Sequence, residues 1–145
     1  MAGQAIWTVA DVLGAACAQN AGLLVEHLAI EFVAIGDDWL EARMPVVQHN
    51  KQPAGLLHGG ASLVLAETLA SVGCFHTLDP ATHSCVGLEI NANHLRGARA
   101  GFVHGRATPV HRGRSTQVWE IRLCDDDGRT TCIARCTMAV LARRD

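Results

Sequence analysis

One charged residue within a long apolar stretch constrains this chain more than any other feature of its sequence. Between Lys51 and Asp79 the only Asp, Glu, Lys or Arg is Glu67. The part from about residue 58 to residue 75 lacks proline and is apolar on nearly every side, which predicts a buried helix. A carboxylate buried there without a partner is unfavourable. Glu67 is therefore expected to belong to a site, unless it lies on an exposed stripe or pairs with an arginine from elsewhere in the chain.

The start of this helix predicts a place for an anion or an oxyanion. No Ser, Thr, Asp or Asn stands at the N-cap, so the first amides are expected to lack the usual side-chain acceptor. Gly59 and Gly60 would let a ligand approach these amides at the positive end of the helix dipole. The alternative is that the two glycines only permit tight packing of the turn.

The spacing along the helix predicts a site shared between two chains. Glu67 lies eight residues after Gly59, which is roughly 12 Å along one helix. A nucleophile and an oxyanion donor must each come within about 3 Å of one carbonyl group. Two helices that run antiparallel across a two-fold axis could meet this demand, whereas one helix could not. Ser71, four residues after Glu67, lies on the same face and could share the site. We therefore expect a homo-oligomer, either a dimer or a dimer of dimers, and no active monomer.

The remainder of the chain predicts an α+β fold, with an antiparallel sheet wrapped around one long central helix. With 145 residues, 49% hydrophobic and 18% charged, the chain is expected to form a single domain, residues 1–145. Thr8 followed by Asp11 resembles the start of a short helix that runs to about Gln19. Strands are expected at about 28–35, 39–44, 85–96, 101–110, 116–124 and 131–141, with turns at 36–38 and 126–128.

The distribution of charge favours a phosphate-bearing small molecule as ligand. Residues 1–95 hold nine acidic and two basic residues, whereas residues 96–145 hold ten basic and five acidic residues. Arginines near strand ends suit phosphate groups, although solvated strand edges are an equal explanation for any single one. The net charge of −2 and the 4% aromatic content make nucleic acid a poor candidate partner.

Cysteine spacing and the N-terminus predict a cytoplasmic protein that binds no metal. The six cysteines form no CxxC pair and no zinc-type cluster with histidine, so we expect free, buried thiols. The N-terminus has no basic region, and Asp11 interrupts its apolar stretch. The sequence therefore predicts neither a signal peptide nor a membrane span.

Four segments together resemble a known family. They are His58–Ser62 and Leu65–Glu67, with Lys51–Pro53 before them and Val86–His94 after them. This combination resembles the hotdog-fold acyl-CoA thioesterases. More narrowly, it is similar to the bacterial subgroup of 1,4-dihydroxy-2-naphthoyl-CoA thioesterase and the enterobactin-pathway proofreading thioesterase. The resemblance covers nearly the whole chain, from about residue 7 to residue 141.

The resemblance implies a role for each candidate catalytic residue. Glu67 would attack the thioester carbonyl as a nucleophile or activate water as a general base. The Gly59 amide of the partner chain would hold the oxyanion, and His58 would orient or polarise the carbonyl. Gln52 would bind near the thioester or the attacking water, and Ser71 would form a hydrogen bond within the acyl site. From the residues alone, His58 could equally be a capping or packing histidine and Gln52 a loop residue.

The resemblance also implies the substrate and its binding residues. It suggests an acyl-CoA, with an aromatic acyl group such as hydroxybenzoyl or dihydroxynaphthoyl, and coenzyme A as part of the substrate rather than a cofactor. His94, Arg96, Arg112 and Arg114 would lie toward the coenzyme A nucleotide. An acyl or aryl carrier protein thioester is a further possible substrate. Two other functions stay open from the sequence: a hotdog enoyl-thioester hydratase or dehydratase, and a non-catalytic module that binds acyl-CoA or an acyl carrier.

Overall fold

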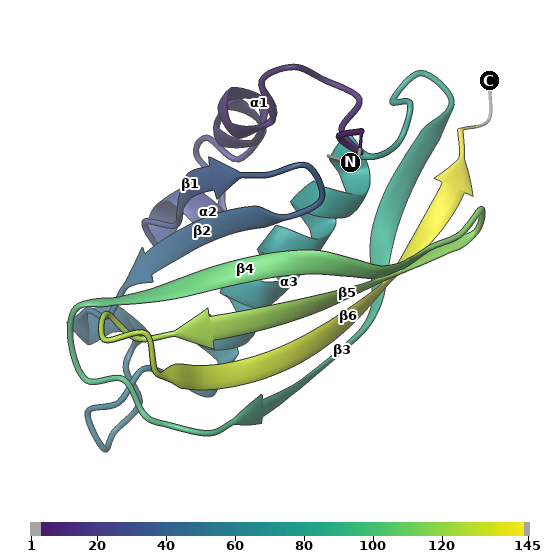
Figure 1. Cartoon of the computed structure of the whole chain (residues 1–145). Coiled ribbons are helices and arrows are strands. Elements are labelled where there is room, and N and C mark those ends of the chain that lie inside the picture. The colour runs from purple at the N-terminus through teal and green to yellow at the C-terminus, as the bar shows by residue number, and fades with distance from the viewer. Residues whose placement is uncertain (1–3, 144–145) are drawn as a thin grey trace.

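Six strands form one antiparallel sheet that curls around the long helix α3 in the computed structural model, which describes residues 4–143 (Figure 1). The strands follow the order β1-β2-β4-β5-β6-β3 in the sheet. The α+β prediction of an antiparallel sheet around one long helix is confirmed. The elements in chain order are α1 (Val12–Gln19), α2 (Leu24–His27), β1 (Glu31–Ile35), β2 (Leu40–Pro45), η1 (Gln48–Asn50), α3 (Gly59–His76), β3 (His83–His94), β4 (Phe102–Arg112), β5 (Thr116–Cys124) and β6 (Thr130–Ala142).

The side of α3 that faces the sheet is the centre of the core. Ten of its 18 residues are buried, and Leu65 and Leu69 are fully enclosed. Trp119 of β5 packs against Gly73, where a Cβ atom would lie 2.8 Å from the indole ring. The indole Nε1 donates to Gln117 Oε1 (3.0 Å), so the largest buried side chain has its polar atom satisfied.

The other side of α3 carries a stripe that the sheet does not cover, so the prediction of a helix buried on all sides is wrong for a single chain. Leu63, Val64, Thr68 and Ser71 are half-buried, and Glu67 is exposed. These residues recur at three- and four-residue spacing and therefore lie on one face of the helix. We call this face the α3 stripe.

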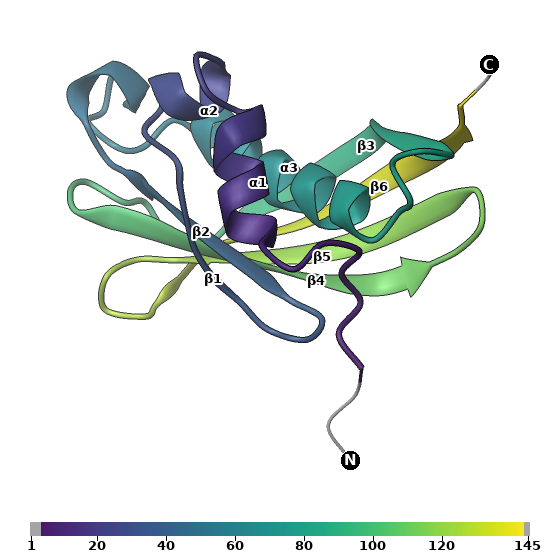
Figure 2. The same cartoon turned by 90° about the horizontal axis from the view of Figure 1, so that it is seen from above.

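The N-terminal segment differs in detail from its prediction. Asp11 alone caps α1, through Oδ1, which accepts from the Gly14 amide (2.9 Å). The Thr8 hydroxyl instead donates to the main-chain oxygens of His76 (2.9 Å) and Leu78 (3.0 Å), which ties this segment to the end of α3. Figure 2 shows α1 and α2 beside α3, on the side of β1 and β2.

The strand expected from residue 28 begins only at Glu31. The four-residue helix α2 and the positive φ angle of Ala29 (52°) come before it. The remaining predicted strands and both turns match the observed elements to within a few residues. Within the described part of the chain, no helix is long and apolar enough to cross a membrane.

Strand β3 forms one edge of the sheet. It is 12 residues long and pairs with β6 alone among the strands of residues 4–143. A β-bulge interrupts its register between Gly87 and Glu89. Val86 and Leu88 are 49% and 61% exposed, so a long and partly apolar edge faces outward in a single chain.

The cysteines are free thiols in differing environments. Cys74, Cys132 and Cys136 are buried, as predicted for small apolar side chains, whereas Cys85 and Cys124 are half-buried. Cys17 lies on the outward side of α1 and is exposed. The sequence analysis predicted a buried thiol at this position. Among residues 4–143, no three His, Cys, Asp or Glu side chains lie together so that they could hold a metal ion.

Candidate active site

His58 caps the start of α3, which corrects the expectation that the first amides lack a side-chain acceptor. Its Nδ1 atom accepts from the Gly60 amide (2.8 Å). The capping alternative for His58 is therefore what the structure shows. A ring nitrogen that accepts a hydrogen bond carries no proton, so the proton of the neutral ring is on Nε2. His58 is exposed, and Nε2 is available as a donor to a ligand.

The Gly59 amide lies at the surface of a cavity beside His94. No oxygen of residues 4–143 accepts a hydrogen bond from this amide. A Cβ atom at position 59 would lie 3.0 Å from His94 Nε2. Glycine at this position thus lets the imidazole of His94, at the end of β3, lie directly against the start of α3.

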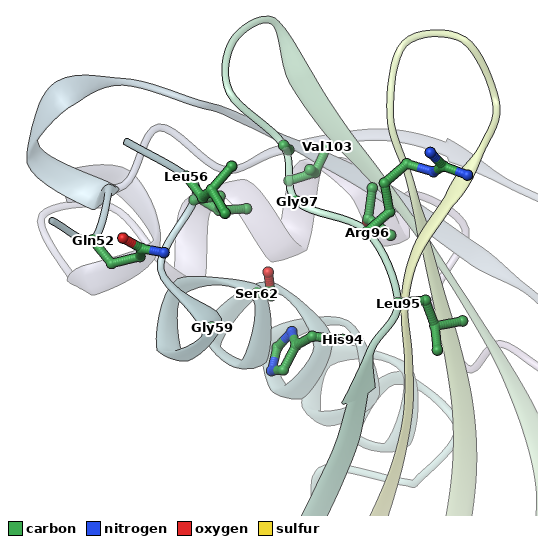
Figure 3. Close-up of a pocket in the computed structure, with 12 residues that line it drawn as sticks. Gln52, Leu56, Gly59, Ser62, His94, Leu95, Arg96, Gly97 and Val103 are labelled. Carbon is green, nitrogen blue, oxygen red and sulfur yellow. The ribbon is translucent and has the colours of Figure 1, made fainter. Parts of the chain in front are cut away.

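The cavity has a volume of about 330 Å³ and gathers four of the predicted site residues: Gln52, Gly59, His94 and Arg96. Figure 3 shows Gln52 and His94 on either side of Gly59 at the start of the helix. The wall of the cavity also includes Ser62 and a set of apolar side chains. We call this the helix-start cavity. The full set of lining residues is Gln52, Leu56, Leu57, Gly59, Ser62, His94, Leu95, Arg96, Gly97, Ala98, Val103 and Thr131.

A tight turn fixes Gln52 as a hydrogen-bond donor. The Gly55 amide donates to the Gln52 carbonyl (2.9 Å), and the Gln52 amide donates to the Leu56 carbonyl (2.8 Å). The side-chain Oε1 accepts from the Ala54 amide. Because the oxygen is engaged, the side-chain NH₂ is the group that Gln52 can offer to a carbonyl oxygen or a water molecule in the cavity.

Glu67 and Ser71 line a different cavity, of about 260 Å³. We call this the Glu67 cavity. Glu67 is exposed and forms no ion pair or hydrogen bond with any of residues 4–143, so the predicted alternative of an arginine partner is not observed. The exposed stripe, the other alternative, is its position in a single chain. The cavity is lined by Asn20, Leu24, Val64, Glu67, Thr68, Ser71 and Val72.

The Glu67 carboxylate lies over Gly87, a contact that we did not predict. A Cβ atom at position 87 would lie 2.6 Å from Glu67 Oε1. Gly87 stands at the bulge of β3, and a glycine within a strand pattern is a signal of a bulge or of a close approach. The sequence thus contained a signal for Gly87, but none that linked it to Glu67.

Ser71 and Cys136 are two neutral side chains near Glu67. The Ser71 hydroxyl donates to Met138 Sδ (4.0 Å), a weak acceptor that it can exchange for a better one on a ligand. Burial, together with the negative charges of Glu67 and Glu89, raises the pKa of the Cys136 thiol to about 12. Cys136 therefore stays a neutral thiol below the carboxylate.

The four predicted nucleotide-binding residues do not come together within one chain. His94 and Arg96 line the helix-start cavity, whereas Arg112 ends β4 and Arg114 lies in the turn to β5. The Arg112 charge acts on Cys74, near the C-terminal end of α3. Within a single chain the two pairs therefore lie at opposite ends of α3, and their role toward the coenzyme A nucleotide stays a prediction.

Asn20 and Leu24 are site candidates that the sequence analysis missed. Both come from the segment around the end of α1 and the start of α2, and both line the Glu67 cavity. An asparagine directly after a helix indicates a C-cap, which Asn20 is. That local signal says nothing about the cavity on which its side chain lies.

The chain is similar in sequence to known thioester hydrolases. Residues 54–132 match the family profile of the Thioesterase superfamily. The chain is 49% identical over 136 residues to 1,4-dihydroxy-2-naphthoyl-CoA hydrolase from Escherichia coli (strain K12), covering 94% of this chain and 99% of that protein. It is 47% identical over 136 residues to the proofreading thioesterase EntH from Cronobacter turicensis, covering 94% and 98% of the two chains.

Solved structures agree with the sequence relatives. A mutant thioesterase from Pseudomonas aeruginosa matches with a TM-score of 0.93 at 47% sequence identity, covering 96% of this chain and 100% of that one. A thioesterase from Haemophilus influenzae matches with a TM-score of 0.90 at 42% identity, covering 94% and 95%. The chain therefore belongs to the Thioesterase superfamily, has the hotdog fold and is a thioester hydrolase.

Proposed function

We propose that this protein hydrolyses an acyl-CoA thioester to a free acid and coenzyme A, in a site built from two chains. One observation carries the proposal: α3 presents the free Gly59 amide in the helix-start cavity and Glu67 in a separate cavity eight residues later. Both groups have to reach one carbonyl, so a second copy must supply one of them. Membership of the thioesterase family favours this reaction over the hydration of an enoyl thioester and over a purely binding role.

Two surfaces of the chain support self-association. The α3 stripe presents half-buried Leu63 and Val64, and the free edge of β3 presents Val86 and Leu88. The contact of Glu67 with Gly87 makes the stripe and the edge neighbours. Two copies that pack these surfaces in antiparallel orientation would remove both from water. We propose a homodimer as the smallest active unit, with a dimer of dimers as the larger alternative.

In the proposed reaction Glu67 acts on the thioester carbonyl of a substrate held by the partner chain. As a general base, it takes a proton from water while the water oxygen bonds to the carbonyl carbon. As a nucleophile, it forms a mixed anhydride with the acyl group, and water then hydrolyses this anhydride. In both routes the Gly59 amide stabilises the oxyanion, with the Nε2 proton of His58 and the NH₂ group of Gln52 as nearby donors. In the general-base route the C–S bond breaks as the oxyanion collapses, and the thiolate takes up the proton that Glu67 removed from water. In the nucleophilic route the C–S bond breaks as Glu67 becomes acylated, and the thiolate takes up the proton that the later hydrolysis releases.

The arginines suggest how the coenzyme A phosphates bind. His94 and Arg96 lie beside the helix-start cavity of one chain. Antiparallel helices would bring the C-terminal end of the partner's α3 towards that cavity. Arg112 and Arg114, which lie at that end, would then add their charges to the same phosphate site.

An aromatic acyl group is the proposed substrate class, since one relative is named 1,4-dihydroxy-2-naphthoyl-CoA hydrolase. Hydroxybenzoyl-CoA and dihydroxynaphthoyl-CoA are the first candidates, and a carrier-protein thioester is the alternative form of the same acyl group. We further propose that the chain acts in the cytoplasm as one domain, without a cofactor, a metal ion or a nucleic-acid partner. Its net charge of −2 and the absence of zinc-type cysteine spacing support these choices.

Thiol release tests the proposal. Native protein is incubated with benzoyl-, hydroxybenzoyl-, naphthoyl- and straight-chain acyl-CoA, beside Glu67→Ala and the matched control Glu120→Ala. Loss of the catalytic carboxylate should lower kcat at least about 100-fold while the fold is kept. Glu120 forms a surface ion pair with Arg122, so its loss should leave the rate unchanged. Equal rates for native protein and Glu67→Ala would contradict the proposed role of Glu67.

A further inference from the structure

Asn20 is held rigidly at the wall of the Glu67 cavity. It forms the C-cap of α1, and its backbone amide donates to the carbonyls of Ala16 and Cys17 (both 3.3 Å). Its side-chain Nδ2 donates to the Ala16 carbonyl (2.8 Å), and its own carbonyl accepts from the Leu23 amide (3.2 Å). The backbone amide and one N–H of the side-chain amide are therefore engaged, which fixes the orientation of the side chain.

The side-chain oxygen of Asn20 is an acceptor without a donor. Within residues 4–143, no group donates a hydrogen bond to Oδ1, although the side chain is half-buried and lines the cavity. An amide oxygen can accept two hydrogen bonds, and it loses free energy where neither protein nor water supplies a donor. A ligand that displaces water from this cavity must therefore bring a donor for Oδ1, or bind less tightly.

The other walls indicate what kind of ligand carries that donor. Leu24, which is 56% exposed, lines the cavity together with Val64 and Val72, and these side chains supply apolar surface for a ring. Among residues 4–143, Glu67 is the only charged side chain that lines the cavity. Its negative charge opposes an acyl group that carries a carboxylate but accepts a neutral hydroxyl group.

We propose that Asn20 is a specificity-determining residue, whose Oδ1 atom accepts a hydrogen bond from a hydroxyl group on the aromatic acyl ring. Leu24 and Val64 contact the ring itself and do not distinguish a substituted ring from a plain one. This inference rests on the proposed thioesterase function, in which the acyl group lies next to Glu67. If Asn20 is a helix cap only, its loss changes stability and leaves the substrate preference as it was.

The test is a selectivity ratio. We would measure kcat/KM for benzoyl-CoA and for the 2-, 3- and 4-hydroxybenzoyl-CoA isomers with native protein, Asn20→Ala and Asn20→Ser. Native protein should prefer one hydroxylated isomer to benzoyl-CoA. Loss of one hydrogen bond should lower that ratio roughly three- to ten-fold in both variants, with benzoyl-CoA turned over at close to the native rate. Leu24→Ala, the matched control, should lower kcat/KM for all four substrates alike.

The possible outcomes separate this inference from the proposed function. Hydrolysis with an unchanged ratio in a folded Asn20 variant, or no preference for any hydroxylated isomer in native protein, would overturn the role of Asn20 and leave the thioesterase proposal intact. Failure of native protein to release thiol from any of the four would instead count against the proposed function. Melting temperatures show which variants are folded, and the serine variant keeps a short polar side chain at the helix end if alanine destabilises it.

Discussion

At the scale of single residues, the position of the Glu67 carboxylate depends on the side chain that Gly87 lacks. An added Cβ atom would come within 2.6 Å of Glu67 Oε1, the mobile end of a long side chain. Gly87→Ala should therefore leave the fold and melting temperature nearly unchanged, because the carboxylate can swing away. It should lower kcat by roughly ten- to a hundred-fold, because a displacement of about 1 Å suffices for such a loss.

A double-mutant cycle shows whether Gly87 acts through Glu67. In the Glu67→Ala background, the additional change Gly87→Ala should have no further effect on the residual rate. Steady-state kinetics on the four proteins measures this coupling. If the two losses multiply instead, Gly87 affects turnover by another route.

At the scale of elements, the end of α3 contains a histidine that is buried without a full set of partners. His76 is 2% exposed, and Nε2 has no hydrogen-bond partner within the described chain. Burial lowers the pKa of His76 below its usual value of 6.5, because the protonated ring would be desolvated. At a pH between 6.5 and the lowered pKa of the folded state, His76 is protonated in the unfolded chain but neutral in the folded one. Protonation therefore favours unfolding in this range, and the stability that is fully present above pH 6.5 falls as the pH decreases through it.

Replacing His76 should weaken the acid sensitivity of the fold. Native protein should lose melting temperature as pH falls from 7 to 5, and His76→Leu should lose less over the same range. His27→Gln, which changes an exposed histidine, serves as the matched control and should follow the native curve. Thermal unfolding monitored by circular dichroism measures all three. Parallel curves for native protein and His76→Leu would show that other groups control the acid response.

The elements were predictable where a local pattern determines them. The proline-free apolar run gave α3, and the turns at 36–38 and 126–128 separated the strands that they connect. Helix α2 was missed because four residues are too few for a periodic pattern, and the apolar residues from Leu28 onward favoured a strand. The exposed stripe that carries Glu67 stayed only an alternative, because composition does not show which side of a helix the sheet covers.

The site was predictable only in part, because several of its contacts depend on packing between elements rather than on local sequence. Glu67 stood out by its isolation in the sequence, and the spacing from Gly59 showed that one helix cannot complete the site. The cap formed by His58 depends on a ring that accepts from the amide of Gly60, two residues later, and histidine is not among the residues preferred at N-caps. The approach of Gly87 to Glu67 joins residues from different elements, and it follows from packing rather than from local sequence.

At the scale of the whole molecule, a shared site predicts that two inactive variants restore each other. Gln52→Ala should impair the half of the site at the helix start, and Glu67→Ala the half at the carboxylate. In a mixed dimer one site combines the intact Gln52 of one chain with the intact Glu67 of the other. After co-refolding in equal amounts, random pairing should restore about a quarter of the native thiol-release rate.

Controls make the complementation test decisive. Each variant refolded alone should stay inactive, as should the double variant Gln52→Ala/Glu67→Ala refolded with either single variant. Size-exclusion chromatography would show that the mixtures are assembled to the same degree as native protein. A mixture that is assembled but no more active than its components would place both residues in one chain's site.

The free edge of β3 has a consequence for how the amount of protein controls its activity. If the second chain that completes the site packs along this edge, an isolated chain has all its catalytic groups but no working site. Turnover per chain then follows mass action: it falls on dilution below the dissociation constant of the dimer and recovers on concentration. The abundance of the protein in the cell would thus set the fraction of chains that are active as well as their number.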